Sequence, residues 1–194
     1  MSSNPYDPKT FKVAFIGSHG VGKTTLCYGL AARLKALDIS LDVVGEVARR
    51  CPLPINQDTT LAAQAWILHT QIAEETVAGA RYDLVICDRS VLDNFIYLVL
   101  AAGSQPPLEQ LVSGWIETYD LLVRVPIVDH LHADGLRSTD PTFQRAVEQG
   151  LDREIDQRDL PMLDLDGLER DAWLERVFEE VRRRFHPLTQ LELL

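Results

Sequence analysis

Short apolar runs alternate along the chain with longer segments in which apolar residues recur every three or four positions. The short runs predict β-strands, and the longer segments predict helices that bury one face. One short run, Asp83–Cys87, is unbroken and bounded by charged residues, as is typical of a fully buried parallel strand. The full set of predicted strands is Val13–Ile16, Ser40–Val44, Asp83–Cys87, Asp120–Val125 and Pro161–Leu165.

Helices are predicted between these strands. They cover Gly22–Leu37, a short helix from Val47 that ends before Pro52, a long one from a cap at Asp58 or Thr59 to Ala80, and then Ser90–Ala102, Leu108–Glu117, Pro141–Asp156 and Glu169–Phe185. This alternation predicts an α/β fold, a three-layer sandwich with a five-stranded, mostly parallel sheet covered by helices on both faces. Such sheets bind ligands beyond the carboxyl ends of their strands.

Composition indicates one acidic domain. The 194 residues are 46% apolar and carry a net charge of −10. We expect a single domain over residues 11–186, a flexible N-terminus at 1–10 and a C-terminal tail at 187–194. The negative charge disfavours nucleic acid as a partner. The sequence contains no run of 18 apolar residues, so we expect no membrane span. Three widely spaced cysteines without a zinc-ligand pattern favour reduced thiols in a cytoplasmic protein.

The first predicted strand runs directly into a glycine-rich turn and then into a helix. The sequence Gly17-x-x-x-x-Gly22-Lys23-Thr24 in this setting is a P-loop, whose backbone N–H groups and helix N-terminus attract phosphate. Lys23 is expected to reach the β/γ-phosphates, and the Thr24 hydroxyl is expected to bind Mg²⁺. The predicted nucleotide-binding residues are Gly17, Ser18, His19, Gly20, Val21, Gly22, Lys23, Thr24 and Thr25.

Asp88 and Arg89 follow the third predicted strand. An Asp at this point is expected to hold Mg²⁺ or to act as a base. P-loop ATPases usually have Glu next, to activate water, but here the next residue is Arg89, which cannot be a base. A guanidinium can instead bind a phosphate or carboxylate with two hydrogen bonds, which favours transfer to a bound acceptor. A capping Asp beside a solvent-facing Arg is the alternative.

Two further groups are candidates for binding the acceptor. Glu46 follows the second strand, where a carboxylate can bind a substrate hydroxyl or take its proton, and Arg49 lies three residues on. A surface Glu–Arg pair is the other interpretation. The long helix carries Gln64, Ile67, Gln71 and Glu74 on one stripe beside Trp66, which suits either a nucleobase or a solvated face.

A third group of residues predicts a lid. Arg137, in the segment Asp134-Gly135-Leu136-Arg137, precedes a helix that carries Arg145 and Arg153. An arginine in a mobile segment over the phosphates would neutralise charge as the phosphoryl group moves. Arg137 is the main candidate for this role.

These features resemble the P-loop nucleoside and nucleotide kinases. The similarity is greatest to the kinase domain of NadR proteins, which phosphorylate nicotinamide riboside, and to related small AAA-type ATP-binding domains. It is carried by Gly45-Glu46-Val47-Ala48-Arg49, by Asp88-Arg89-Ser90-Val91-Leu92-Asp93-Asn94-Phe95 and by Asp134-Gly135-Leu136-Arg137. The resemblance implies that Glu46 acts as the base, that a small helical lid lies at about residues 134–158 and that the acceptor is nucleoside-like.

The sequence therefore predicts an enzyme that uses ATP and Mg²⁺ to phosphorylate a hydroxyl or phosphate of a nucleoside- or nucleotide-like acceptor. Lys23, Glu46, Asp88 and Arg137 are its expected catalytic residues. Thr24 and Asp88 are the expected metal ligands, and Glu46, Arg49, Gln64 and Arg89 are expected to bind the acceptor. Alternatives are a kinase acting on a hydroxymethylpyrimidine or a 5′ end in DNA, and an ATPase or nucleotide switch that signals to a protein partner. A homodimer is possible in either case.

Overall fold

A computed structural model of the protein describes residues 10–55, 59–128 and 141–185. Within these ranges, five strands form one sheet in the order β2-β3-β1-β4-β5, and every neighbouring pair is parallel. The strands are β1 (Phe11–Ile16), β2 (Leu41–Val44), β3 (Leu84–Asp88), β4 (Leu121–Arg124) and β5 (Met162–Asp164). The predicted strands are confirmed, with ends that differ by one or two residues.

The helices also follow the prediction, with differences at their ends. They are α1 (Lys23–Lys35), the 3₁₀ helix η1 (Val47–Arg50), α2 (Leu61–Gly79), α3 (Val91–Ala102), α4 (Pro106–Ile116), α5 (Pro141–Arg158), the 3₁₀ helix η3 (Arg170–Ala172) and α6 (Trp173–Arg184).

Three helix starts were predicted incorrectly. Helix α6 begins at Trp173 rather than at Glu169, because residues 170–172 form the separate 3₁₀ helix η3. The cap of α2 is neither Asp58 nor Thr59 but Thr60, whose hydroxyl accepts a hydrogen bond from Ala63 N at 3.2 Å. Helix α4 begins two residues earlier than expected, at Pro106, because the fixed φ of proline suits the first helical turn.

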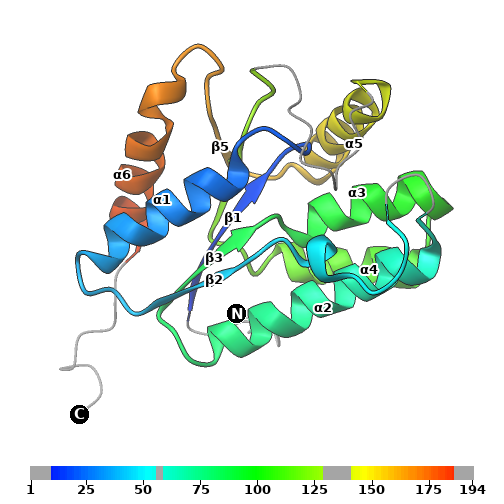
Figure 1. Ribbon diagram of the computed structural model, residues 1–194, viewed down its shortest axis with the longest axis horizontal. Coiled ribbons are helices and arrows are strands. Elements are labelled where there is room, and N and C mark those ends of the chain that lie inside the picture. The colour runs from blue at the N-terminus through cyan, green and yellow to red at the C-terminus, as the bar shows by residue number, and fades with distance from the viewer. Residues whose placement is uncertain (1–9, 56–58, 129–140, 186–194) are drawn as a thin grey trace.

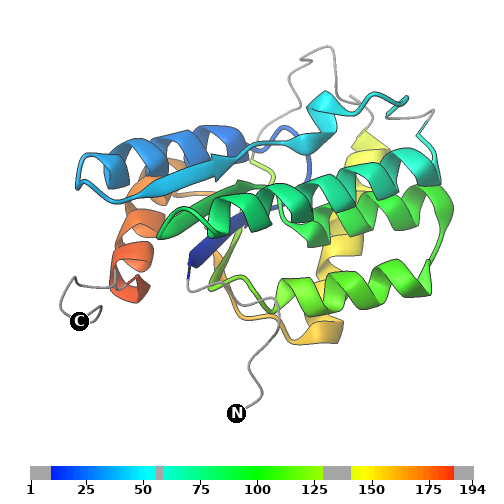
Figure 2. The same cartoon turned by 90° about the horizontal axis from the view of Figure 1, so that it is seen from below.

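Helices cover both faces of the sheet, so that the molecule has three layers (Figures 1 and 2). Alternate residues of β1 point to opposite faces: Val13 and Phe15 pack with α1 and α6, whereas Ala14 and Ile16 pack with α2, α3, α4 and α5. Both faces of β1 are therefore buried, as a central parallel strand requires. None of the helices in the described ranges is long and apolar enough to cross a membrane.

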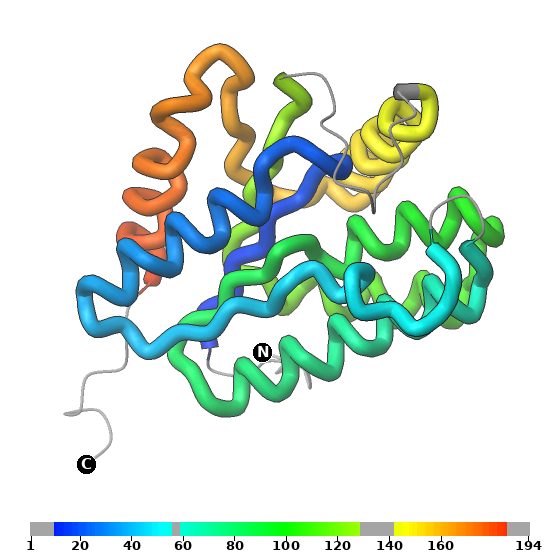
Figure 3. Tube along the Cα trace, in the orientation of Figure 1, coloured from blue at the N-terminus to red at the C-terminus, as the bar shows by residue number. Residues whose placement is uncertain are grey.

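The sheet order places β1 between β3 and β4, so the loop that leaves β1 emerges between two neighbours. The tube trace shows helix α5, in yellow, close to this loop (Figure 3). The carboxyl ends of β1, β2 and β3 meet at the same edge because the strands are parallel. The predicted functional residues that follow these strands are thereby brought to one edge of the sheet.

Candidate active site

The glycine-rich loop has the backbone conformation that its sequence predicts. Gly17 and Gly22 have φ values of 143° and 97°, a conformation that residues with a Cβ atom rarely adopt. A Cβ atom on Gly17 would also lie 2.6 Å from the carbonyl oxygen of Val125, whereas a Cβ on Gly22 would meet nothing within 4 Å. Helix α1 begins immediately after Gly22. The loop therefore leads straight to a helix N-terminus, the arrangement that binds phosphate.

Lys23 lies at the start of α1 and is buried, with its ammonium close to the loop. Its Nζ donates hydrogen bonds to the carbonyl oxygens of Gly17 at 2.8 Å and Ser18 at 2.5 Å. Burial lowers the pKa of Lys23 to about 8, and the positive charge of Arg89 adds to this effect, against nearby carboxylates that raise it. The Lys23 ammonium should therefore lose its proton at mildly basic pH.

Thr24 and Asp88 meet across the edge of the sheet. The Thr24 hydroxyl donates to Asp88 Oδ2 at 2.6 Å, although the two residues are 64 positions apart in the sequence. A hydroxyl next to a carboxylate supplies the hard oxygen ligands that Mg²⁺ prefers. The donor set therefore fits Mg²⁺ in the position predicted from the sequence.

Glu46 lies between two arginines. Arg89 Nε donates to Glu46 Oε1 at 2.9 Å, and Arg49 Nε donates to Glu46 Oε2 at 2.8 Å. Arg49 is exposed, but Arg89 is buried, so a solvent-facing Arg89 is excluded. The structure thus brings together the three predicted acceptor-binding residues that follow β2 and β3.

The Arg89 guanidinium has an unusual environment. Burial alone would lower the pKa of Arg89, but Tyr97, Glu46 and Asp93 outweigh burial and raise it, so the side chain stays charged. The guanidinium carbon lies 5.1 Å from the centre of the Tyr97 ring. Among the described residues, nothing accepts a hydrogen bond from the buried Arg89 Nη1.

Gln64, the fourth predicted acceptor-binding residue, is buried on α2, and its amide donates to the Thr59 hydroxyl at 2.8 Å. Gln71 is buried as well, so a fully solvated stripe is excluded. Glu74 does not continue this stripe, because it is partly exposed and forms an ion pair with Arg50 at 2.6 Å. Its neighbour Glu75 takes the buried position instead. The predicted stripe was therefore wrong at its last residue.

Asp93 is a residue of this edge that sequence reasoning did not select. It is buried in the first turn of α3, where Oδ1 accepts from Gly17 N at 3.0 Å and Oδ2 accepts from Ser90 N at 2.9 Å. Ser90 caps α3 in return by accepting from Asp93 N at 3.3 Å. The spacing Ser-x-x-Asp after a strand was the available signal, since it marks a capping box.

Helix α5 contacts the first half of the P-loop. Glu148 Oε1 accepts from Ser18 N at 2.7 Å, and Gln144 Nε2 donates to the carbonyl oxygen of His19 at 3.2 Å. The His19 ring stacks on Phe143, with centroids 6.1 Å apart. These contacts join the described part of the predicted lid, residues 141–158, to the loop. Arg137 and residues 134–140 lie outside the described residues.

The other two lid arginines, Arg145 and Arg153, are exposed on α5. Arg153 donates to the carbonyl oxygen of Gln149 in its own helix at 3.2 Å. The structure does not bring Arg153 into contact with the P-loop.

Comparison with known proteins agrees with this geometry. A family model described as an AAA domain matches residues 12–176, which is most of the chain. The chain belongs to this AAA-domain family. The match spans the P-loop, β3 and α5, so all the described candidate residues lie within the family's domain. None of the curated proteins compared with the sequence matches it.

Two solved structures have the same fold as this AAA-domain chain. A NadR protein in complex with NR matches with a TM-score of 0.72 at 20% identity, over 93% of this chain and 54% of that one. Deoxyadenosine kinase from M. mycoides with bound dATP matches with a TM-score of 0.59 at 12% identity, over 89% and 99% of the two chains. The chain thus spans about half the length of the NadR protein. The resemblance expected from the sequence, to a P-loop kinase fold, is confirmed.

Proposed function

We propose that the protein transfers a phosphoryl group from ATP to a hydroxyl of a nucleoside-like acceptor. The observation that carries this proposal is the position of Arg89, which follows Asp88 directly and holds Glu46 at 2.9 Å beside the P-loop. P-loop ATPases usually have a Glu directly after this Asp to activate water, and here that position is Arg89. A buried guanidinium with a spare donor suits a bound acceptor instead.

Each residue has a definite task in this proposal. The P-loop, residues Gly17–Thr25, and the Lys23 ammonium would hold the triphosphate, with the Gly17 and Ser18 amides bonded to Asp93 and Glu148 and the later amides facing the phosphates. Thr24 and Asp88 would hold Mg²⁺. The bound ion would neutralise charge on the β- and γ-phosphates. Glu46 accepts a hydrogen bond from the acceptor hydroxyl and receives its proton as the phosphoryl group arrives. Most of the rate acceleration then comes from positioning and from charge neutralisation.

The acceptor class is proposed from the same edge of the sheet. Arg49 pairs with Glu46, and Gln64 presents a buried amide on α2. The two structural neighbours are named for nucleoside chemistry, as a NadR–NR complex and as a deoxyadenosine kinase. We propose a lid at about residues 134–158, with Arg137 as its charged residue. The net charge of −10 favours a small acceptor over nucleic acid.

The test is a comparison of ADP formation with and without acceptor. The full chain is incubated with ATP and Mg²⁺ alone, and then with nicotinamide riboside, deoxyadenosine or other nucleosides and mononucleotides. We expect ADP and a phosphorylated product only when the right acceptor is present. Equal ADP formation with and without every acceptor would instead identify an ATPase or nucleotide switch. Lys23→Ala is the negative control and should abolish turnover in either case.

A further inference from the structure

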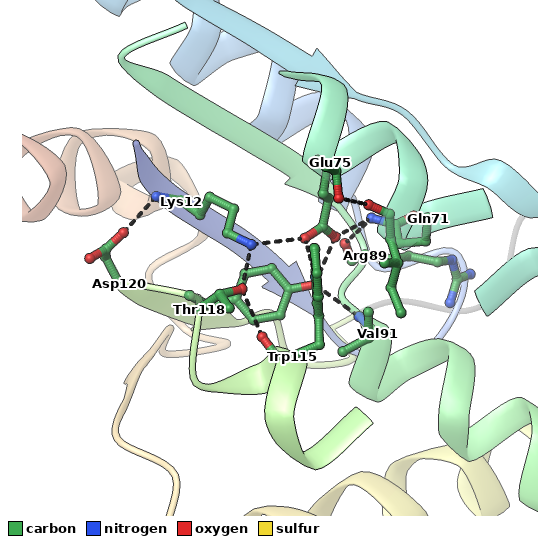
Figure 4. A network of polar contacts seen from close by, with 11 residues as sticks. Lys12, Gln71, Glu75, Arg89, Val91, Trp115, Thr118 and Asp120 are labelled. Atoms are coloured by element: carbon green, nitrogen blue, oxygen red, sulfur yellow. Dashed lines mark hydrogen bonds and ion pairs between the residues drawn. The ribbon is translucent and has the colours of Figure 1, made fainter. Parts of the chain in front are cut away.

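A buried ion pair lies in the helix-covered core and connects to Arg89 (Figure 4). Glu75 on α2 and Lys12 on β1 are each 1% exposed, and Lys12 Nζ lies 3.4 Å from Glu75 Oε2. Trp115 Nε1 donates to the same oxygen at 2.7 Å. Lys12 also donates to the Thr118 hydroxyl and lies over the Trp115 ring. Such a pair adds little to stability compared with apolar packing, so its presence calls for another explanation.

Two arms lead from Glu75 to the turn that contains Arg89. In the first, Gln71 Nε2 donates to Glu75 Oε1 at 2.8 Å and to the carbonyl oxygen of Arg89 at 3.3 Å. In the second, the Tyr119 hydroxyl donates to Glu75 Oε1 at 2.7 Å and accepts from Val91 N at 3.1 Å. The backbone of the turn is thus held at Arg89 and again two residues later, and both contacts depend on one carboxylate.

The turn needs such support because its backbone is strained. Arg89 has a φ of 93°, in a region that non-glycine residues rarely adopt. The other described non-glycine residues with positive φ are Asp38 and Asp159, which follow the ends of α1 and α5, where the left-handed conformation is common. A strained residue of this kind is energetically costly and persists only where its surroundings fix it.

The strained residue is also the point at which the site changes direction. Asp88, on one side, contacts Thr24 of the P-loop, whereas the side chain of Arg89 contacts Glu46 after β2. A change in the Arg89 backbone would therefore move the guanidinium relative to Glu46. The contacts from Gln71 and Tyr119 act on the backbone that sets this direction.

We propose that Glu75 and Gln71 are positioning residues that hold Arg89, and through it Glu46, in the geometry needed to bind the acceptor. This inference rests on the proposed function for its catalytic consequence. The holding of Arg89 can be measured without any acceptor. Gln71→Leu is the informative variant, because it cuts the arm to Arg89 and leaves the Lys12–Glu75 pair intact. Thr118→Val is the matched control, since it removes a buried partner at the Lys12 end.

The first measurement is hydrogen exchange of the Arg89 Nε–H group by ¹H–¹⁵N NMR, with the signal assigned from its loss in Arg89→Lys. In the unchanged protein the group should be protected, because it is buried and bonded to Glu46. Gln71→Leu should speed its exchange about tenfold, the effect of one lost buried hydrogen bond. Thr118→Val should leave it unchanged. Unchanged exchange in Gln71→Leu, or equal changes in both variants, would overturn the proposal.

The second measurement is a kinetic cycle with an acceptor that the unchanged protein phosphorylates. Gln71→Leu should lower kcat/KM for the acceptor on the order of tenfold, with KM for ATP unchanged. In the Arg89→Lys background the same change should cost nothing further, since its effect passes through Arg89. If the losses of kcat/KM from Gln71→Leu and Arg89→Lys multiplied in the double variant, Gln71 would act independently of Arg89, and the positioning role would be overturned. If no acceptor is phosphorylated, the proposed function fails, and the exchange measurement still decides whether Gln71 holds Arg89.

Discussion

Lys23 and Glu46, which the proposed reaction assigns to phosphate and to the acceptor, are single side chains held in place by their neighbours. The Lys23 ammonium is buried against the loop carbonyls, and its pKa falls to about 8. Glu46 has each of its carboxylate oxygens bonded to an arginine. Both groups are oriented by hydrogen bonds within the protein, which reduces the reorganisation that a reaction requires.

The lowered pKa of Lys23 predicts that nucleotide affinity depends on pH. Phosphate binds the protonated lysine, so affinity should be constant below pH 7 and should fall as the pH rises through 8, by up to about tenfold for each pH unit. Calorimetric titration with magnesium ADP between pH 6.5 and 9.5 measures this. In Lys23→Arg, whose side chain stays charged, the dependence should disappear. A constant affinity in the unchanged protein would show that Lys23 does not contact the phosphates.

Glu46→Gln should lower kcat by about a hundredfold while leaving ATP affinity nearly unchanged, because an amide cannot receive the acceptor proton. Initial rates with varied ATP and varied acceptor separate the two effects. Glu74→Gln is the control, since Glu74 also pairs with an arginine, Arg50, but belongs to a partly exposed pair on α2. A large loss of ATP affinity in Glu46→Gln would place Glu46 at the metal instead.

Sequence alone indicated the residues that follow strands, such as Thr24, Glu46 and Asp88, because a strand end fixes their position at one edge. It did not indicate Glu75 or Glu148. Their role depends on which side chains α2 and α5 meet after folding, and helical spacing does not specify that. The assignment of Glu74 in place of Glu75 shows the limit, since both positions lie within about 60° of Gln71 around a helix that turns about 100° per residue.

At the scale of elements, the start of α3 connects helix capping with the P-loop. Asp93 closes the capping box with Ser90 and also accepts the hydrogen bond from Gly17 N. The strand and helix order was predictable because apolar period and turn residues act locally. The cap of α2 and the start of α4 were missed because several adjacent residues, such as Thr59 and Thr60, have similar capping ability.

Ser90→Ala should destabilise the protein by about 1 kcal/mol and should also weaken binding of magnesium ADP. The second effect is expected because Ser90 helps to orient Asp93, which holds Gly17. Thr60→Ala removes the cap of α2 and should cost a similar free energy of unfolding without changing nucleotide affinity. Urea unfolding and calorimetric titration of both variants provide the comparison. Equal affinity for magnesium ADP in both variants would show that the cap of α3 does not affect nucleotide binding at the P-loop.

At the scale of the whole molecule, the Lys12–Glu75 pair joins the central strand to α2, and Trp115 and Thr118 add the end of α4. Lys12→Met leaves a buried carboxylate without its cation and should lower the free energy of unfolding by about 3–5 kcal/mol. Urea unfolding measures this. Arg50→Met, in a partly exposed pair, should change stability by less than about 1 kcal/mol. A similar loss of unfolding free energy in both variants would show that breaking the buried pair costs no more than breaking the partly exposed one.

The central place of β1 has a consequence for how the molecule fluctuates. A strand with partners on both edges and helices over both faces exposes its amides only when the sheet itself opens, so they should exchange with solvent most slowly. The P-loop, which in the proposed function takes up and releases a nucleotide in every cycle, is thus attached to the strand whose amides should exchange most slowly. In such a cycle the segments around the P-loop would rearrange, while the P-loop itself and the central sheet that supports it would stay in place.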